Sequence, residues 1–283
     1  MTSMKLGILH PGSMGISIAA SAQNSNCEVF WASEGRSQQT FDRAAEFNLR
    51  DTTTLAALCK ICSTIVCVCP PHAAEEVADQ VIASGFKGLY LDANAISPGR
   101  AIRIGQKMTH AGASFVDGGI IGGPAWEPNS TFLHLSGPDA QDAASYFSAG
   151  PLETRNIGVE IGKASAIKMC FAAYTKGRTA LLCAIVAASE SLDVREELFE
   201  QWSQYWPEFA EETTQRIIGV TAKAWRFEGE MFEISTTFEE AGVPGGFHEA
   251  AADIYGRLVD FKDAPSPPTF EEVLSALLED EKS

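Results

Sequence analysis

Apolar and polar positions follow two different patterns along the chain. In the first half, short apolar runs are separated by segments with helical spacing. The runs are predicted to be strands at 4–9, 27–32, 64–69, 88–92, 114–117 and 131–136. The intervening segments are predicted to be helices at 16–24, 37–47, 55–60, 73–84, 98–111 and 140–148. Strands that alternate with helices predict a parallel sheet covered by helices on both faces.

The pattern changes near residue 160, after which strand signals are absent. A long, alanine-rich apolar pattern predicts a helix over 163–192. Further helices are predicted at 194–206, 208–224, 231–241, 247–262 and 269–279. We therefore predict two domains, an α/β domain over residues 1–160 and an all-helical domain over residues 161–283.

A glycine turn joins the first predicted strand to the first predicted helix. It begins with His10 and Pro11 and continues with Gly12, Ser13, Met14 and Gly15. Glycine lets the backbone approach phosphate oxygens, and a helix N-terminus offers unpaired N–H groups. The spacing is close to Gly-x-Gly-x-x-Gly, with His10 at the first glycine. We expect this turn to cradle the pyrophosphate of a dinucleotide, in an α/β domain with a Rossmann-type doubly wound sheet; a plain strand–turn–helix is the alternative.

The end of the second predicted strand bears on the choice of dinucleotide. Ser33 stands near the position where an acidic residue would bind the 2′-hydroxyl of NAD. Arg36 and Ser37 follow at a helix start, where they could accept the 2′-phosphate of NADP. Glu34 opposes this interpretation, and Arg36 could instead be a solvated surface charge. The segment favours NADP over NAD.

Charge and composition exclude several partners. The net charge of −16 argues against nucleic acid and anionic membranes. The apolar runs are short and broken, and the N-terminus leads directly into a strand, so we expect neither a membrane span nor a signal peptide. The expected location is the cytoplasm.

The seven cysteines do not form the pattern of a disulfide framework. Cys59, Cys62, Cys67 and Cys69 are close in sequence, and His72 follows them. Cys67 and Cys69 lie within a predicted buried strand, where cysteine behaves as a small hydrophobe. We therefore favour buried cysteines over a zinc site, and no metal is expected.

Two further segments could carry chemistry. Residues 117–123 contain four glycines after a strand, which predicts a loop that approaches a ligand, with a tight structural connection as the alternative. Lys168 lies in an apolar helical run, and helical spacing places Ala172 and Thr175 on its face. A desolvated lysine has a lowered pKa and can exchange protons near neutral pH. Taken alone, such a lysine is more often a solvated cation.

Four motifs in this order resemble the β-hydroxyacid dehydrogenases, the family of 3-hydroxyisobutyrate and 6-phosphogluconate dehydrogenases. Residues 7–15 resemble their Gly-x-x-Gly-x-Gly-x-Met-Gly, and residues 92–98 their Asp-x-Ser-Thr-x-x-Pro. Residues 117–123 resemble their substrate loop, and residues 162–168 the segment that carries their catalytic lysine. The sequence departs from the family at His10, at Ile121 in place of the loop serine, and at Ala172 in place of an asparagine. These departures indicate a branch with a distinct helical C-terminal domain.

The resemblance implies an NADP-dependent oxidoreductase that transfers hydride between nicotinamide and a small hydroxy or carbonyl substrate. Lys168 would be the general acid and base, and Pro70 and Asn94 would line the nicotinamide side of the cofactor. The implied substrate contacts are Ile121, Gly122, Gly123, Ala172, Thr175 and His248. The helical domain would form a homodimer interface.

Two other functions stay open. A related branch reduces imines, but it usually carries another residue at the position of Lys168. A non-catalytic NADP-binding sensor would account for the missing serine and asparagine.

Overall fold

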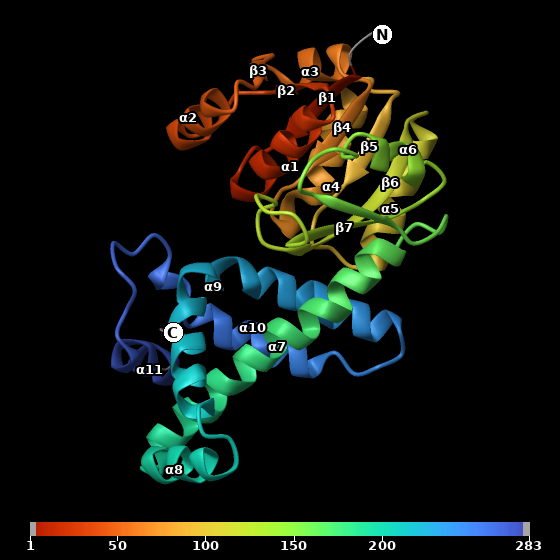
Figure 1. Cartoon of the computed structure of the whole chain (residues 1–283). Coiled ribbons are helices and arrows are strands. Elements are labelled where there is room, and N and C mark those ends of the chain that lie inside the picture. The colour runs from red at the N-terminus through yellow and green to blue at the C-terminus, as the bar shows by residue number, and fades with distance from the viewer. Residues whose placement is uncertain (1–3, 280–283) are drawn as a thin grey trace. The chain divides into compact units, whose positions relative to one another are not determined.

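The computed structural model describes residues 4–279. The chain divides into two compact units between Met169 and Cys170, inside the long helix α7 (Lys163–Ser191). Figure 1 shows the first unit in red to green and the second in green to blue. The sequence places the domain boundary near residue 160, a few residues before α7 begins. Each unit is described by itself below.

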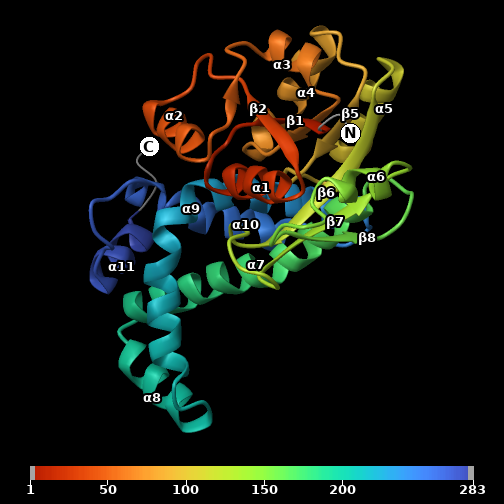
Figure 2. The same ribbon diagram turned by 45° about the horizontal axis from the view of Figure 1, so that its top comes forward.

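The first unit is built on a sheet of eight strands. They are β1 (Met4–Leu9), β2 (Cys27–Trp31), β3 (Arg50–Asp51), β4 (Thr64–Cys67), β5 (Leu89–Asp92), β6 (Ser114–Gly122), β7 (Thr131–Ser136) and β8 (Glu153–Asn156). Their order in the sheet is β3-β2-β1-β4-β5-β6-β7-β8. The strand order therefore reverses between β1 and β4, the third and fourth strands of the sheet. Figure 2 shows β1 and β2 toward one side of the sheet and β6, β7 and β8 toward the other. Such a reversal opens a crevice at the carboxyl ends of the strands, where α/β proteins bind ligands.

Helices cover both faces of this sheet, as predicted. Neighbouring residues of β1 point to opposite sides, so that Ile8 and Leu9 belong to two separate apolar cores. Helices α1 (Ser13–Asn24), α2 (Gln38–Glu46) and α6 (Ala140–Ser145) contribute to the core of Ile8. Helices α3 (Leu55–Ile61), α4 (Ala74–Ala83) and α5 (Pro98–His110) contribute to the core of Leu9. The predicted doubly wound α/β fold is confirmed.

The structure corrects the predicted sheet in two respects. The sheet is not wholly parallel, because β7 pairs antiparallel to β6. The glycine-rich segment after Asp117 is not a loop, because β6 continues through it to Gly122. The short polar strands β3 and β8 were not predicted, since neither carries an apolar run that marks a buried strand.

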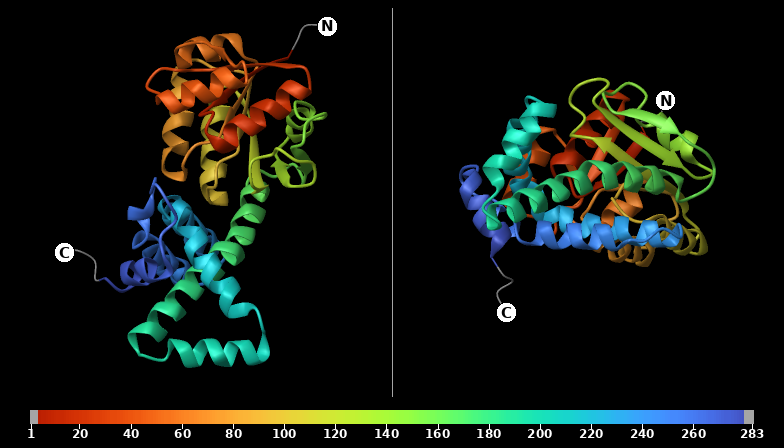
Figure 3. Two further views of the ribbon diagram at one scale, coloured as in Figure 1. Left: turned by 60° about the vertical axis from the view of Figure 1, so that its left-hand side comes forward. Right: turned by 90° about the horizontal axis from the view of Figure 1, so that it is seen from below.

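The second unit is all-helical, as predicted. From residue 170 it contains the rest of α7, then α8 (Arg195–Tyr205), α9 (Phe209–Glu240), α10 (Gly246–Gly256) and α11 (Phe270–Leu278). Helix α8 joins the end of α7 to the start of α9, as the left view of Figure 3 shows. The two helices predicted over 208–224 and 231–241 are one helix, α9. The polar residues between them do not end it, because Glu230 is buried there in an ion pair with Lys176 of α7.

Among the described residues, α7 alone is long and apolar enough to cross a membrane. Half of its most apolar stretch is buried inside the protein. One such helix is weak evidence for a membrane span, because the core helix of a soluble protein passes the same test of length and composition.

Candidate functional site

The glycine turn lies between β1 and α1, at the point where the strand order reverses. Gly12 is the N-cap of α1, and no side chain caps the helix. The first N–H groups of α1 therefore lack helical acceptors. A Cβ atom at Gly15 would lie 2.4 Å from the carbonyl oxygen of His10, so the turn requires glycine there. At Gly12 the nearest atom would be 4.0 Å away, which leaves the approach to the helix N-terminus open.

The end of β2 holds the residues predicted to select the cofactor. Ser33 is buried, whereas Arg36 and Ser37 are exposed. The Ser37 hydroxyl caps α2 by accepting a hydrogen bond from the N–H of Thr40. Burial lowers the pKa of Arg36, and the nearby thiols of Cys69 and Cys67 act on it in the opposite direction.

The loop after β4 and the end of β5 are joined through Asn94. Its side-chain oxygen accepts a hydrogen bond from the N–H of Cys69 at 2.5 Å, and its amide nitrogen donates to the sulfur of Cys67 at 3.5 Å. Asn94 is buried, and Pro70 beside Cys69 is exposed. Two of the predicted nicotinamide contacts therefore lie together at this edge of the sheet.

A polar cluster not foreseen from the sequence lies at the same edge. One donor atom each from His10, Cys67 and Cys69 falls within 4.8 Å of the others. The hydrogen bond between the two sulfurs, which lie 3.7 Å apart, lowers the pKa of Cys67 and raises that of Cys69 because they share one proton. Burial raises the pKa of the neighbouring Asp92 well above its usual range.

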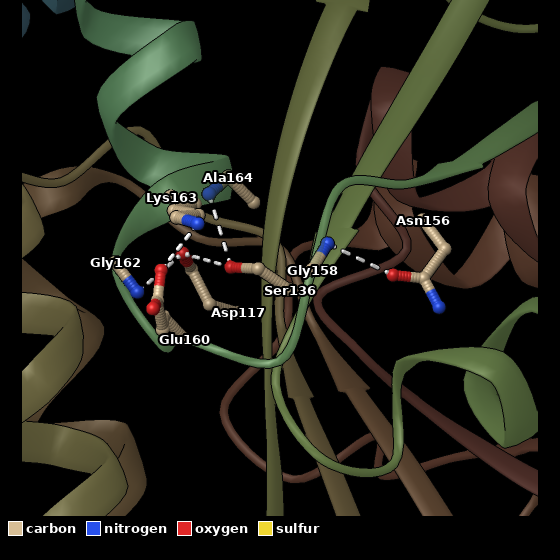
Figure 4. Close-up of polar contacts among 8 residues, drawn as sticks. All are labelled: Asp117, Ser136, Asn156, Gly158, Glu160, Gly162, Lys163 and Ala164. Carbon is tan, nitrogen blue, oxygen red and sulfur yellow. Dashed lines mark hydrogen bonds and ion pairs between the residues drawn. The ribbon is translucent and has the colours of Figure 1, made fainter.

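The buried carboxylate of Asp117 fixes the start of α7 to β6 (Figure 4). One carboxylate oxygen accepts hydrogen bonds from the N–H groups of Gly162 and Ser165 and from the hydroxyl of Ser136. The other accepts the Ser165 hydroxyl at 2.6 Å. Ser136 also accepts the N–H of Ala164, so the first turn of α7 is tied to two strands. Burial raises the pKa of Asp117 despite these bonds.

Glycines in β6 let α7 pack directly on the sheet. A Cβ atom at Gly119 would lie 2.2 Å from the carbonyl oxygen of Ala164 and 3.1 Å from the Cβ of Lys168. The backbone of β6 therefore touches α7 at the turn that carries Lys168. The lysine is half-buried. Within residues 117–123 the structure shows a close approach to helix α7 of the same unit, and the predicted approach to a ligand stays a prediction.

The other predicted substrate residues lie in two places. Ile121, Gly122 and Gly123 form the end of β6 and the start of the following loop, where Gly123 accepts the hydroxyl of Thr131. Nothing lies within 4 Å of a Cβ atom at Gly123. Ala172, Thr175 and His248 belong to the second unit.

In the second unit, the predicted substrate residues have protein partners. Thr175 donates its hydroxyl to the carbonyl of Phe171, and Ala172 is buried. His248 is buried against the rings of Phe238 and Phe247, and burial lowers its pKa. Its Nδ1 has no hydrogen-bond partner among the described residues.

Comparison with known proteins identifies the family. A model described as the NAD binding domain of 6-phosphogluconate dehydrogenase matches residues 5–146, half of the chain. A second, a domain of unknown function (DUF1932), matches residues 189–258. The chain belongs to the β-hydroxyacid dehydrogenase-like family. Its first unit is an NAD(P)-binding domain of the dehydrogenase and reductase type, and the resemblance seen in its motifs is confirmed.

Solved structures of this fold cover nearly all of the chain. A conserved protein of unknown function, described as similar to 3-hydroxyacid dehydrogenases, is 26% identical and covers 91% of this chain and 98% of its own, with a TM-score of 0.65. The 3-hydroxyisobutyrate dehydrogenase of Mycobacterium tuberculosis is 14% identical and covers 98% and 100%, with a TM-score of 0.70. A reductive aminase from Aspergillus terreus is 16% identical and covers 97% and 99%, with a TM-score of 0.57. The last two share the fold alone.

Sequence reasoning missed His10, Cys67 and Asp117 as parts of polar clusters. A signal existed for His10, because a bulky residue stands where the fingerprint has glycine, and its φ is +70°. Cys67 lies far from His10 in the sequence, and only the pairing of β1 with β4 brings them together. Asp117 was assigned to a ligand loop, although its partners are Ser136 of β7 and the residues at the start of α7.

Proposed function

We propose that this protein is an NADP-dependent oxidoreductase that transfers hydride between nicotinamide and a small hydroxy or carbonyl substrate, with Lys168 as general acid and base. One observation carries the proposal. The uncapped N-terminus of α1 follows an open glycine turn at the reversal of strand order. Membership of the dehydrogenase-like family supports a nicotinamide cofactor at that position.

The residues of the first unit fit such a cofactor. The N–H groups from Gly12 to Gly15 would hold the pyrophosphate, because no side chain blocks them at Gly12. Ser33, Arg36 and Ser37 would bind the adenosine side, with the guanidinium on the 2′-phosphate. Pro70 and Asn94 would line the nicotinamide side. The cofactor supplies the hydride acceptor or donor.

Lys168 would move the proton that accompanies the hydride. In oxidation its amine would take the proton of the substrate hydroxyl, and in reduction its ammonium would return it. Its place beside Gly119 puts it next to the strand that ends with Ile121 and Gly122 and is followed by Gly123. We propose these residues, with Ala172, Thr175 and His248 of the second unit, as substrate contacts.

Cofactor choice is tested by titrating the protein with NADPH and with NADH. Arg36→Ala removes a charge-assisted interaction of about 1.5–3 kcal/mol, so NADPH should bind about 10- to 140-fold more weakly. NADH affinity should change little. Arg103→Ala, an exposed arginine on α5, is the matched control. Equal losses for both cofactors in Arg36→Ala would contradict the assignment of the 2′-phosphate.

Turnover is tested with NADPH or NADP and a panel of aldehydes, keto acids, hydroxy acids and ketone–amine pairs. Lys168→Ala should lower turnover about 100- to 10,000-fold, the usual contribution of general acid–base catalysis. Lys163→Ala is the control, because Lys163 is an exposed lysine of the same helix, paired with Glu160. Turnover only with ketone–amine pairs would favour an imine reductase. Tight NADPH binding without turnover would favour a sensor.

We further propose that the protein acts in the cytoplasm as a homodimer on a small-molecule substrate. In the second unit, α7 exposes the large apolar side chains of Phe171, Tyr174 and Leu181. A second copy could cover this face. Sedimentation analysis should show a dimer that Leu181→Glu dissociates and Val243→Glu, an exposed position outside α7, leaves intact. A wild-type monomer would refute the assembly but not the chemistry.

A further inference from the structure

The cluster of His10, Cys67 and Cys69 lies at the ends of β1 and β4, where these two strands pair in the centre of the sheet. The proposed hydride transfer uses none of its three side chains. We propose that these three residues bind a zinc ion, with the fourth coordination position open. This inference does not rest on the proposed function, and it departs from the expectation that the cysteines are only small buried hydrophobes.

The donor atoms are spaced as a tetrahedral zinc site requires. With Zn–S bonds of about 2.3 Å, two sulfur ligands of a tetrahedral site lie about 3.8 Å apart. The sulfurs of Cys67 and Cys69 are 3.7 Å apart, and a ring nitrogen of His10 completes a group whose members all lie within 4.8 Å. Small movements of side chains would therefore suffice for binding. Two thiolates and one imidazole are a donor set that selects zinc over magnesium or calcium.

Unsatisfied polar atoms in the cluster also indicate a missing partner. Nδ1 of His10 and one carboxylate oxygen of Asp92 are buried and have no hydrogen-bond partner among the described residues. Asp92 pairs in register with Cys67 on the neighbouring strand. Buried polar groups in native proteins nearly always have partners. A cation held by His10 and the sulfurs would supply one ligand bond to the imidazole.

Asn94 provides the outer support that metal ligands usually have. Its amide donates to the sulfur of Cys67, and its oxygen holds the backbone N–H of Cys69. One buried side chain therefore orients both cysteines. The cation Arg36 is near enough for the charges of the two thiols to act on its pKa. Because two thiolates neutralise the charge of Zn²⁺, the resulting centre would not repel the guanidinium.

His10 itself fits a ligand role better than a structural one. Its φ of +70° lies in the left-handed region, which is uncommon for residues other than glycine, although histidine tolerates it better than most. Glycine would form this turn without strain. The histidine therefore keeps an unfavourable backbone conformation while placing an imidazole beside two thiols.

The test is zinc binding by the whole reduced protein, without any nucleotide. The protein is stripped with a chelator, titrated with Zn²⁺ alone against a competing indicator, and analysed for bound metal by mass spectrometry. We expect one zinc per chain. Substitution by Co²⁺ should give the charge-transfer absorption of two thiolate ligands, a readout that needs no variant. Absence of tight zinc binding in the reduced wild-type protein would overturn the proposal.

Single substitutions determine which residues bind the zinc ion. Asn94→Ala should weaken zinc binding about 10- to 100-fold, the usual loss for a residue that supports a ligand, and Cys67→Ser, Cys69→Ser and His10→Asn should weaken it further. Cys170→Ser, at an exposed cysteine outside the cluster, is the matched control and should bind as the wild type does. Circular dichroism checks that each variant is folded. Zinc binding that survives Cys67→Ser and Cys69→Ser, or that is lost in Cys170→Ser, would refute the assignment.

Discussion

The contact between β6 and α7 at Gly119 gives a sharp prediction about stability and activity. A Cβ atom at this position would lie 2.2 Å from the carbonyl oxygen of Ala164, where real contacts are not shorter than 3.0 Å. Gly119→Ala therefore requires β6 and α7 to separate by about 0.8 Å, the difference between these distances. The helix cannot move freely, because Asp117 holds its first turn to the same strand.

The expected cost follows from this overpacking. Inserting a methyl group into a close-packed contact costs about 1–3 kcal/mol of unfolding free energy. For a unit of this size, each kcal/mol lowers the melting temperature by about 2–4 °C. A displacement of about 1 Å at a catalytic group can lower turnover about 100-fold, so the proposed activity of Lys168 should fall as well.

Gly123→Ala is the matched control, because a Cβ atom there meets nothing within 4 Å. Its stability should stay within about 0.5 kcal/mol of the wild type, as for most surface substitutions. Both variants are compared by urea unfolding and by thermal melting. Equal stabilities of Gly119→Ala, Gly123→Ala and the wild type would refute the packing argument, whatever the activity shows.

Two other predictions concern buried charges. Asp117→Asn should change how the free energy of unfolding depends on pH. The pKa of Asp117 is raised in the folded state, so the folded chain keeps this proton to a higher pH than the unfolded chain does. The stability of the wild-type protein therefore falls as the pH rises from about 3.9 through the folded pKa. Urea unfolding across this range should show that slope weakened in Asp117→Asn, and a pH-independent difference would contradict the raised pKa. Lys176→Met should cost about 3–5 kcal/mol because it leaves Glu230 buried and unpaired, and adding Glu230→Met should recover much of the loss. Equal stability of the single and double variants in urea unfolding would contradict this pairing.

The sequence predicts those parts of the fold whose signals are local. Apolar periodicity located β1 and β7, and the strand–glycine–helix order located the turn at Gly12. It misread β6, because glycine after a strand usually marks a loop, whereas Gly119 is required by a helix more than 40 residues later in the sequence. It also divided α9, because the ion pair that allows Glu230 to be buried depends on Lys176 of another helix.

The residues of the candidate site show the same difference between local signals and contacts with distant residues. The residues of the glycine turn and of the β2 end could be selected because they are close in sequence and follow a known spacing. The relation of His10 to Cys67 could not, since it depends on which strand pairs with β1. The surroundings of His248 could not be predicted either, because sequence spacing does not reveal that its ring packs against those of Phe238 and Phe247.

The placement of Lys168 follows from the first unit alone. Asp117 holds the first turn of α7 through the N–H groups of Gly162 and Ser165, and Gly119 lets the next turn rest on β6. Both contacts involve the strand that leads to the proposed substrate residues Ile121 and Gly122. A helical turn fixed in this way holds the backbone of Lys168 in place relative to the sheet, and therefore to the glycine turn. Asp117 and Gly119 are thus positioning residues for the proposed proton transfer, and their substitution should affect turnover more than cofactor binding.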